Sequence, residues 1–257
     1  DPVAPVLVGT LALDECELQS IEVHGDVAFL GNIMTWSSGG VLIVDHTDKT
    51  NPVIIHDFED VKKGYGIALS WPHLLIAHPD ESFNIRFRVV DVTDPEIPTL
   101  VSDVAVDAPP FERADFFVDG DFVYMAGFGD VHVIDISDPA MPEMVWKMRA
   151  GMEDIFSMTV WNGSAYLVEY FQIEVIDDFG TSPLAPFGST GPVGFPLGMG
   201  VDGSYAYVTI AASGGFDHEL HVVDLADPSA PVVVGSAGIP GPNSYSGDVE
   251  VEGDIVY

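Results

Sequence analysis

Acidic side chains gather in four segments of this 257-residue chain, and they are the residues best suited to metal chemistry. Carboxylates bind Ca²⁺ through their oxygen atoms when several of them converge on one point. The four groups are Asp14, Glu15 and Glu17; Asp57, Glu59 and Asp60; Glu112 and Asp115; and Glu153 and Asp154. None of them forms a D-x-[DN]-x-[DN]-G loop, so a calcium site and a rim of solvated carboxylates are both open interpretations.

Arg113 is one of only four arginines and lies in the run Pro-Pro-Phe-Glu-Arg-Ala-Asp at residues 109–115. A guanidinium group can hold a ligand carboxylate or sulfate by paired hydrogen bonds. The alternative is an ion pair with Glu112 or Asp115. Three residues occupy similar positions elsewhere, and the predicted ligand site consists of Arg113, Asp115, Glu112, Tyr65, Gln19 and Asp248.

Three aromatic residues lie in other irregular segments: Trp36, Phe83 and Phe216. Exposed aromatic side chains form contact surfaces for proteins or glycans, and we predict such a surface here. The alternative is that these rings fold back over the ends of the strands. His78 and His218 lie on well-separated segments, so we do not expect them to share a metal ion.

The elements that position these residues belong to a repeat. The run Val-Leu-Ile-Val-Asp ends at Asp45, and similar runs end at Asp91, Asp135, Asp177 and Asp224. The intervals between these aspartates are 46, 44, 42 and 47 residues. A repeat of about 45 residues that contains one apolar run indicates a stacked or radial architecture.

Turn residues divide each repeat into four short antiparallel strands. Gly25, Gly120, Gly163, Gly203 and Gly253 each sit beside Asp, Asn, His, Glu or Ser, as tight hairpins require. After the apolar run comes a D-x-T/S/A-D-P-x-x-P turn, in which Asp accepts a hydrogen bond from the backbone two residues on. Repeats of this length with four strands are typical of β-propeller blades. A β-solenoid is the alternative.

The two ends of the chain carry partial repeats. Residues 1–9 match residues 227–235, and residues 244–257 resemble the front of a repeat. We therefore expect an all-β, six-bladed β-propeller of four-stranded antiparallel blades, whose last blade is a composite of N- and C-terminal strands. Residues 1–257 would form this single domain. The chain begins at Asp1 rather than Met, which is typical of a mature protein or of a fragment.

The apolar runs and their Asp-Pro turns resemble the LVIVD-repeat family of bacterial and archaeal surface or secreted proteins. The resemblance covers nearly the whole chain. It implies a β-propeller in an extracellular, cell-surface or periplasmic setting, and it transfers no catalytic residues. In a propeller the irregular segments converge on the mouth of a central channel, where we expect the ligand site.

The net charge and the absence of known motifs disfavour several classes of function. The formal net charge of −33 disfavours nucleic acids and anionic membranes, and no apolar run reaches the ~18 residues that would favour membrane insertion. The only cysteine, Cys16, excludes an internal disulfide. Catalytic motifs such as G-x-S-x-G and H-E-x-x-H are absent from the sequence.

We therefore expect a non-catalytic extracellular module that binds a protein or glycan through its irregular loops, without a cofactor. Two alternatives stay open: a calcium-dependent hydrolase or lyase with its site at the channel mouth, and a self-associating subunit of an extracellular fibre or surface assembly. The identity of the partner does not follow from the sequence.

Overall fold

The computed structural model shows an all-β chain whose strand pairs are antiparallel throughout the described residues. The structure describes residues 6–13, 18–32, 40–108, 114–127, 130–149, 155–161, 163–169, 172–176, 186–189, 195–211, 218–239, 249, 251–252 and 255–256. The strands fall into two compact units, residues 1–147 and residues 148–257. Within the described ranges, no helix has the length and apolar character needed to cross a membrane.

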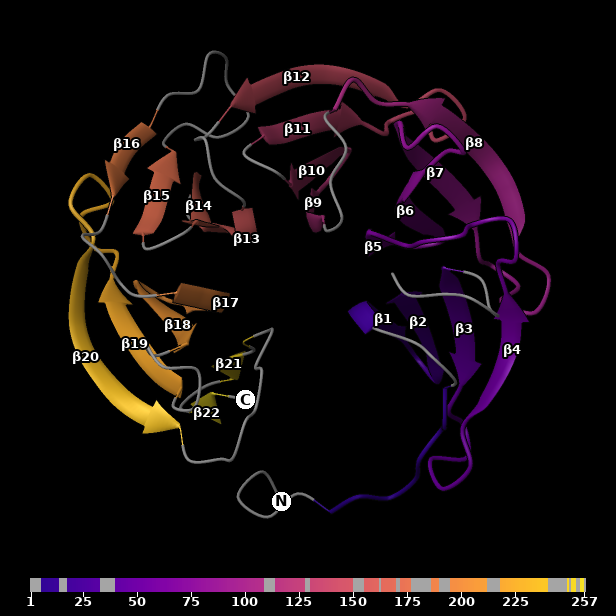
Figure 1. The fold of residues 1–257 in the computed structure, drawn as a ribbon, viewed down its shortest axis with the longest axis horizontal. Helices are drawn as coiled ribbons and strands as arrows, with labels where there is room; N and C mark the ends of the chain where they lie inside the picture. The colour runs from indigo at the N-terminus through magenta and orange to yellow at the C-terminus, as the bar shows by residue number, and fades with distance from the viewer. Residues whose placement is uncertain are drawn as a thin grey trace. The chain divides into compact units, whose positions relative to one another are not determined.

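The first unit contains three four-stranded sheets, each with its strands in sequence order (Figure 1). Blade 1 consists of β1 (Leu18–His24), β2 (Val27–Asn32), β3 (Val41–Asp45) and β4 (Val53–Asp57). Blade 2 consists of β5 (Gly66–Ser70), β6 (His73–Pro79), β7 (Ile85–Asp91) and β8 (Thr99–Ala105). Blade 3 consists of β9 (Asp115–Asp119), β10 (Phe122–Gly127), β11 (Asp130–Asp135) and β12 (Glu143–Arg149).

The second unit contains two further four-stranded sheets and a short hairpin. Blade 4 consists of β13 (Ile155–Trp161), β14 (Ser164–Glu169), β15 (Gln172–Ile176) and β16 (Pro186–Ser189). Blade 5 consists of β17 (Phe195–Asp202), β18 (Tyr205–Ala211), β19 (His218–Asp224) and β20 (Val232–Ile239). The hairpin pairs β21 (Val251–Glu252) with β22 (Ile255–Val256).

The turn chemistry predicted from the sequence is confirmed. Four of the predicted hairpin glycines have φ between 56° and 85°, a region that favours glycine: Gly25, Gly120, Gly163 and Gly203. Four of the repeated Asp residues accept a hydrogen bond from the backbone N–H two residues later, at 2.7 Å for Asp45 and 2.8 Å for Asp91, Asp135 and Asp224. The fourth strand then starts directly after the closing proline, for example at Val53 after Pro52. Local hydrogen bonding therefore sets the strand ends.

The prediction of six blades, with a composite last blade, is wrong. The described residues form an all-β propeller fold with five four-stranded blades, and β21 and β22 form a two-stranded sheet. The physical reason is that a blade needs the buried VxVxD strand at its third position, and the sequence has only five such runs. The partial repeats at the two ends supply turn and edge residues without that central strand.

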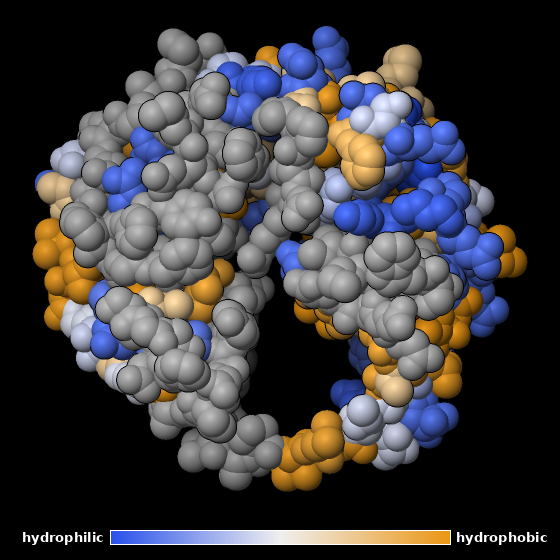
Figure 2. Space-filling view, in the orientation of Figure 1, coloured by the Kyte–Doolittle hydropathy of each residue, from blue (hydrophilic) through white to orange (hydrophobic). Residues whose placement is uncertain are grey.

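Residues 6–13 lie against blade 1 and belong to no strand. Leu11 and Leu13 pack on the face of blade 1 that carries Leu30 and Leu42. Val6, Leu7 and Val8 are 79%, 83% and 59% exposed, and the segment forms an orange surface at the lower margin of Figure 2. These three residues therefore contact water where an outer blade strand was expected.

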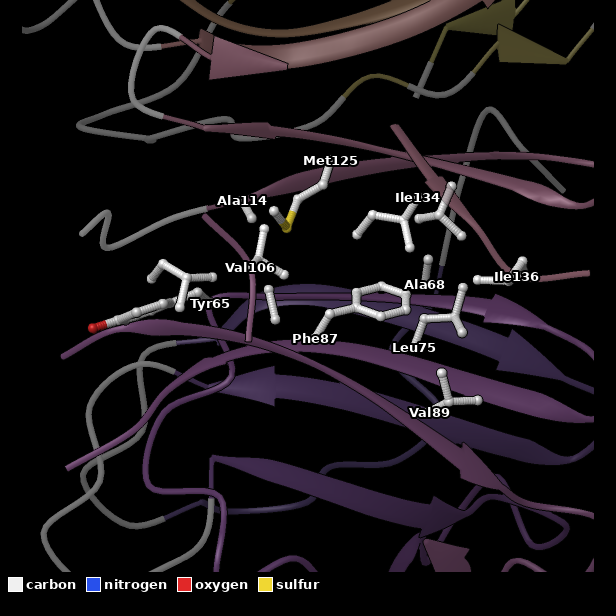
Figure 3. Packing of buried hydrophobic residues seen from close by; sticks show 13 residues of the cluster. Tyr65, Ala68, Leu75, Phe87, Val89, Val106, Ala114, Met125, Ile134 and Ile136 are labelled. Atoms are coloured by element: carbon white, nitrogen blue, oxygen red, sulfur yellow. The ribbon is translucent and has the colours of Figure 1, made fainter. Parts of the chain in front are cut away.

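Four of the five VxVxD strands, β3, β7, β11 and β15, are buried on both faces, as their continuous apolar character predicts, whereas most residues of β19 are half-buried. The first four residues of β3 are all buried, and β7 and β11 follow the same pattern. Between blades 2 and 3, Leu75 and Phe87 pack in one cluster with Met125 and Ile134 (Figure 3). Burial of each such side chain stabilises the fold by ~1.5–3 kcal/mol.

The innermost strands of blades 2 and 3 approach closely. A Cβ on Gly66 in β5 would collide with the carbonyl oxygen of Ala114, which precedes β9. The backbone N–H of Ala114 also donates a hydrogen bond to the carbonyl oxygen of Tyr65 at 2.7 Å. Glycine at position 66 therefore permits the packing that brings the segments around Tyr65 and Asp115 together.

Candidate functional site

Blade 2 carries a cluster of charged residues beneath the loop that joins β6 and β7. His78 on β6 lies opposite Arg86 on β7, and Arg88 lies opposite Asp103 on β8. Directly opposite residues point to the same face of an antiparallel sheet, and alternate residues of one strand do so too. The four side chains therefore share one face at one end of the blade.

Asp103 is the centre of this cluster. Its Oδ1 accepts a hydrogen bond from Arg86 Nε at 2.5 Å, and its Oδ2 accepts two from Arg88, at 3.0 Å from Nε and 2.8 Å from Nη2. Arg88 Nη1 donates to Asp60 Oδ2 at 2.7 Å. Asp60 belongs to the segment between β4 and β5, so Arg88 joins that segment to blade 2.

His78 lies beside this network. Its Nε2 is 3.4 Å from Asp103 Oδ2, and its Nδ1 is 3.2 Å from the carbonyl oxygen of Pro79. Burial, followed by the positive charge of Arg88, lowers the pKa of His78, so its imidazole is neutral at pH 7. Burial alone would raise the pKa of Asp103, but hydrogen bonds from Arg88 and Arg86 outweigh it and hold that pKa below its ordinary value.

The charges of the cluster balance. Two guanidinium groups face two carboxylates, and the Arg88 side chain is only 10% exposed. Arg88 is buried, whereas the Asp60 side chain is 68% exposed. A matched set of this kind is suited to fixing neighbouring segments in place. The cluster therefore holds the end of blade 2 and the 57–65 segment together beneath the β6–β7 loop.

The β6–β7 loop is held by its own hydrogen bonds. Asp80 Oδ1 accepts from the backbone N–H of Ser82 at 2.8 Å and of Asn84 at 2.9 Å. The N–H of Phe83 donates to the carbonyl oxygen of Asp80 at 3.0 Å. Phe83 has φ of 63°, which is unusual for a bulky residue, and its side chain is 61% exposed. The loop therefore presents an aromatic ring to water from a fixed backbone.

Polar residues recur at the same two positions of the later VxVxD strands. The residue three places before the repeated Asp is, in turn, Arg88, His132, Glu174 and His221. The residue five places before it is Arg86, Asp130, Gln172 and Glu219. Blade 1 has Leu42 and Gly40 at these positions, so its strand has no such pair.

In blade 3 the charges are reversed relative to blade 2. Asp130 on β11 pairs with Lys147 on β12, with 3.3 Å between Oδ2 and Nζ. Lys147 also donates to the carbonyl oxygen of Asp107, in the segment that follows blade 2, at 2.9 Å. His132 is 1% exposed, and burial and the charge of Lys147 lower its pKa. The neutral imidazole therefore belongs to the core.

In blade 4 two carboxyl groups are buried together. Glu169 and Glu174 are 3% and 6% exposed, and Gln172 Nε2 donates to Glu169 Oε2 at 3.1 Å. Burial, and then the charge of Glu169, raise the pKa of Glu174 to about 7. In blade 5, His221 Nε2 lies 2.9 Å from Glu219 Oε2. Each blade from the second onward therefore has its own polar pair.

Of the six predicted ligand-site residues, three are described. Tyr65 is 3% exposed and packs in the apolar cluster between blades 2 and 3, with Lys63 Nζ 5.9 Å from its ring centroid. Asp115 begins β9 and is half-buried, and its Oδ1 accepts from the N–H of Phe116 at 3.0 Å. Gln19 lies on β1 and is half-buried. Tyr65 and Asp115 lie on adjoining segments, and the ligand site stays a prediction.

The other predicted residues lie outside the described ranges: Glu112, Arg113 and Asp248 of the ligand site, and Trp36 and Phe216 of the contact surface. Phe83 is the contact-surface residue that the structure describes. Within the described ranges, no group of three or more His, Cys, Asp or Glu is placed to hold a metal ion. Asp60, one of the carboxylates considered for calcium, is ion-paired with Arg88. Calcium binding stays a prediction.

The comparisons with known proteins agree with this architecture. The family model described as LVIVD repeat matches residues 114–149, which contain blade 3, and residues 198–237, which cover most of blade 5. No curated protein matches the chain.

Solved structures share the fold at low sequence identity. A functionally unknown protein from Desulfotomaculum acetoxidans DSM 771 has a TM-score of 0.69 at 11% identity, covering 94% of this chain and 78% of its own. The computationally designed Ika8 protein has a TM-score of 0.64 at 9% identity, with 97% and 70% covered. A hypothetical selenium-binding protein from Sulfolobus tokodaii has a TM-score of 0.60 at 10% identity, with 83% and 59% covered. These similarities show the fold alone.

Proposed function

Because this chain carries LVIVD repeats folded as four-stranded β-propeller blades, we propose that it is a non-catalytic binding module that contacts a protein partner through Phe83 and the β6–β7 loop. The repeat architecture fits a binding module in general. The particular contact is supported by one observation, the exposed Phe83 ring on a backbone of positive φ.

Phe83 adopts its positive φ in a tight turn that the hydrogen bonds between Asp80 and Asn84 close, and this conformation has an energetic cost for a bulky residue. A non-glycine residue in the left-handed region is disfavoured by ~1–2 kcal/mol. The ring is 61% exposed, so it adds little to the core. Aromatic side chains on pre-organised loops are typical anchors of protein interfaces, because little freedom is lost when they bind. Contact with a partner would account for both the ring and its backbone.

The cluster around Asp103 supports the loop from beneath. Arg86 and His78 lie on the strands that enter and leave the loop, and both lie beside Asp103. These contacts fix the ends of the loop, so that the loop meets a partner in one conformation. We also propose an extracytoplasmic setting, which rests on what the resemblance to surface and secreted repeat proteins implies. Immunodetection in cell-surface and culture fractions of the source organism would test that setting.

Selection from a displayed random peptide library on the immobilised chain tests the contact. We expect enriched peptides, resynthesised with a fluorophore, to bind the Phe83→Ser variant at least tenfold more weakly. Phe122→Ser is the matched control, because Phe122 is 40% exposed at a tight hairpin of blade 3 and should leave binding unchanged. Phe83→Gly should also lose binding without lowering Tm, since glycine accepts the positive φ.

Equal affinity of the enriched peptides for wild type and both Phe83 variants would refute the proposed contact. A glycan array tested with the same variants measures whether the loop binds a glycan instead of a protein. Glycan binding that depends on Phe83, with no peptide enriched, would refute a protein partner while keeping the loop as the binding element.

A further inference from the structure

The outer strands of the five blades differ in how well their edges are protected against pairing with strands of other molecules. These strands are β4, β8, β12, β16 and β20. β20 contains eight residues, and its first seven, Val232 to Gly238, are all exposed. Figure 1 shows β20 as a long outer arrow, and an orange patch lies at the left margin of Figure 2, where β20 begins. Among the described strands, only β19 pairs with β20, so its outer edge carries apolar side chains into water.

Exposed sheet edges are usually blunted by charge, proline or short length. β12 carries Glu143 and Lys147, and β8 carries Asp103. β4 ends in a histidine and an aspartate, and β16 has four residues and begins with Pro186. The sequence of β20, Val-Val-Val-Gly-Ser-Ala-Gly-Ile, contains no charge and no proline. Among the five outer strands, β20 alone has none of these protections.

We propose that the edge of β20 accepts an extended segment of a partner protein, with an uncharged β-branched centre and a basic residue at each end. Strand addition of this kind uses the free backbone groups of an edge, and side chains set the specificity. This inference does not rest on the contact proposed for Phe83.

The basic residues at the ends of the partner segment are inferred from acidic residues on β19, the strand that pairs with β20. Glu219 lies opposite Gly238 near one end of β20, and Asp224 lies opposite Val232 at the other. Glu219 and Asp224 are five residues apart on β19, which is about 17 Å at ~3.3 Å per residue. A partner segment with four uncharged residues between two Lys or Arg residues therefore matches the two acidic side chains in spacing and charge.

Net charge favours such a partner over a second copy of this chain. The formal net charge of −33 attracts a basic segment and repels another copy. The two occupants also differ in their response to salt. Above 0.1 M salt the Debye length is ~10 Å or less. Screening then weakens the attraction between this chain and a basic segment, and it also relieves the repulsion between two copies of the chain. Salt therefore changes the two affinities in opposite directions.

A fluorescein-labelled hexapeptide with four alternating Val and Thr residues between two terminal Lys residues is the probe, and fluorescence anisotropy measures its binding to the full chain. We expect affinity to fall severalfold between 50 and ~300 mM NaCl. The same peptide with Glu at both ends should bind at least tenfold more weakly. Hydrogen exchange should show new protection of the backbone amides of β20 when the Lys peptide is bound.

The double variant Val234→Lys with Gly238→Lys tests the location. Val234 is 56% exposed, and a Cβ on Gly238 meets no atom within 4 Å, so both lysines fit the fold. We expect at least a tenfold loss of affinity, whereas Val145→Lys on β12, where Val145 is 48% exposed, should leave affinity within twofold. Circular dichroism confirms that each variant is folded.

Three results would overturn the proposal. The first is equal affinity of the Lys peptide for wild type and the double variant. The second is exchange protection at strands other than β20. The third is salt-promoted dimerisation in sedimentation velocity that the double variant abolishes, which would assign the edge to a second copy.

Discussion

The buried carboxyl pair in blade 4 makes a quantitative prediction for Glu174→Gln. Burial and the neighbouring Glu169 raise the pKa of Glu174 to about 7, above its ordinary value of 4.5. The folded state therefore holds this proton more tightly than the unfolded state does. Its contribution to stability is fully present below pH 4.5 and is lost as the pH rises through 7.

The magnitude follows from the two pKa values. The difference between 4.5 and about 7 corresponds to ~3.5 kcal/mol, at ~1.4 kcal/mol for each pKa unit. Partial solvation of the pair reduces this to about 2 kcal/mol. Glutamine keeps a hydrogen-bond donor and acceptor and never ionises. We therefore expect Glu174→Gln to be about 2 kcal/mol more stable than wild type at pH 8 and nearly equal to it at pH 5.

Urea unfolding at pH 5 and pH 8, followed by tryptophan fluorescence, measures this difference. The chain contains 41 acidic residues, so wild type alone has a broad pH dependence, and only the difference between variant and wild type isolates Glu174. Glu143→Gln, on the exposed edge of β12, is the matched control and should show the same small difference at both pH values. A Glu174→Gln variant less stable than wild type at pH 8 would refute the argument.

Two further predictions concern packing in the first unit. Arg88→Met should lower the free energy of unfolding by ~1–3 kcal/mol, because it leaves the partly buried Asp103 with Arg86 as its remaining partner, and adding Asp103→Leu should recover part of the loss. Equal losses in the single and double variants in urea titrations would contradict the ion-pair explanation. Gly66→Ala should lower the free energy of unfolding by ~1–3 kcal/mol, because its Cβ would collide with the carbonyl oxygen of Ala114. Gly238→Ala is the control and should change the free energy of unfolding by less than ~0.5 kcal/mol. Equal effects of the two substitutions on the urea midpoint would contradict the close approach between Gly66 and Ala114.

Strands and turns could be predicted from the sequence because their causes are local. The positive φ of Gly25 and the hydrogen bond from Asp45 to its own backbone involve residues at most two apart. The number of blades is not local in this sense. Val6 to Val8 have nearly the same sequence as Val232 to Val234, yet only the second run forms a strand, because β19 lies beside it. A strand-like run predicts a strand only where a neighbouring strand accepts its hydrogen bonds.

The candidate site was predicted only in part, and for a similar reason. Phe83 could be singled out because an aromatic residue in an irregular segment is visible in the sequence. The cluster around Asp103 could not be predicted in the same way, because Arg88 lies inside an apolar strand rather than in an irregular segment. Alignment of the repeats on their final Asp would have shown the recurring polar position. The partner of Arg88 is Asp60, which lies in the segment between β4 and β5. The path of this segment differs from repeat to repeat, so the repeat pattern does not predict the contact.

The polar pairs of blades 2 and 3 explain how blades with similar apolar strands contact different neighbouring segments. In blade 2 the third strand supplies the basic residue, Arg88, which reaches Asp60 of the segment before the blade. In blade 3 the third strand supplies Asp130, and the basic residue, Lys147, lies on the fourth strand. If blade 3 occupied the place of blade 2, His132 would take the position of Arg88, and Asp60 would lose its guanidinium partner. The apolar strands make the blades alike in packing, and the charges of blades 2 and 3 make each of these two blades fit the segment that precedes it.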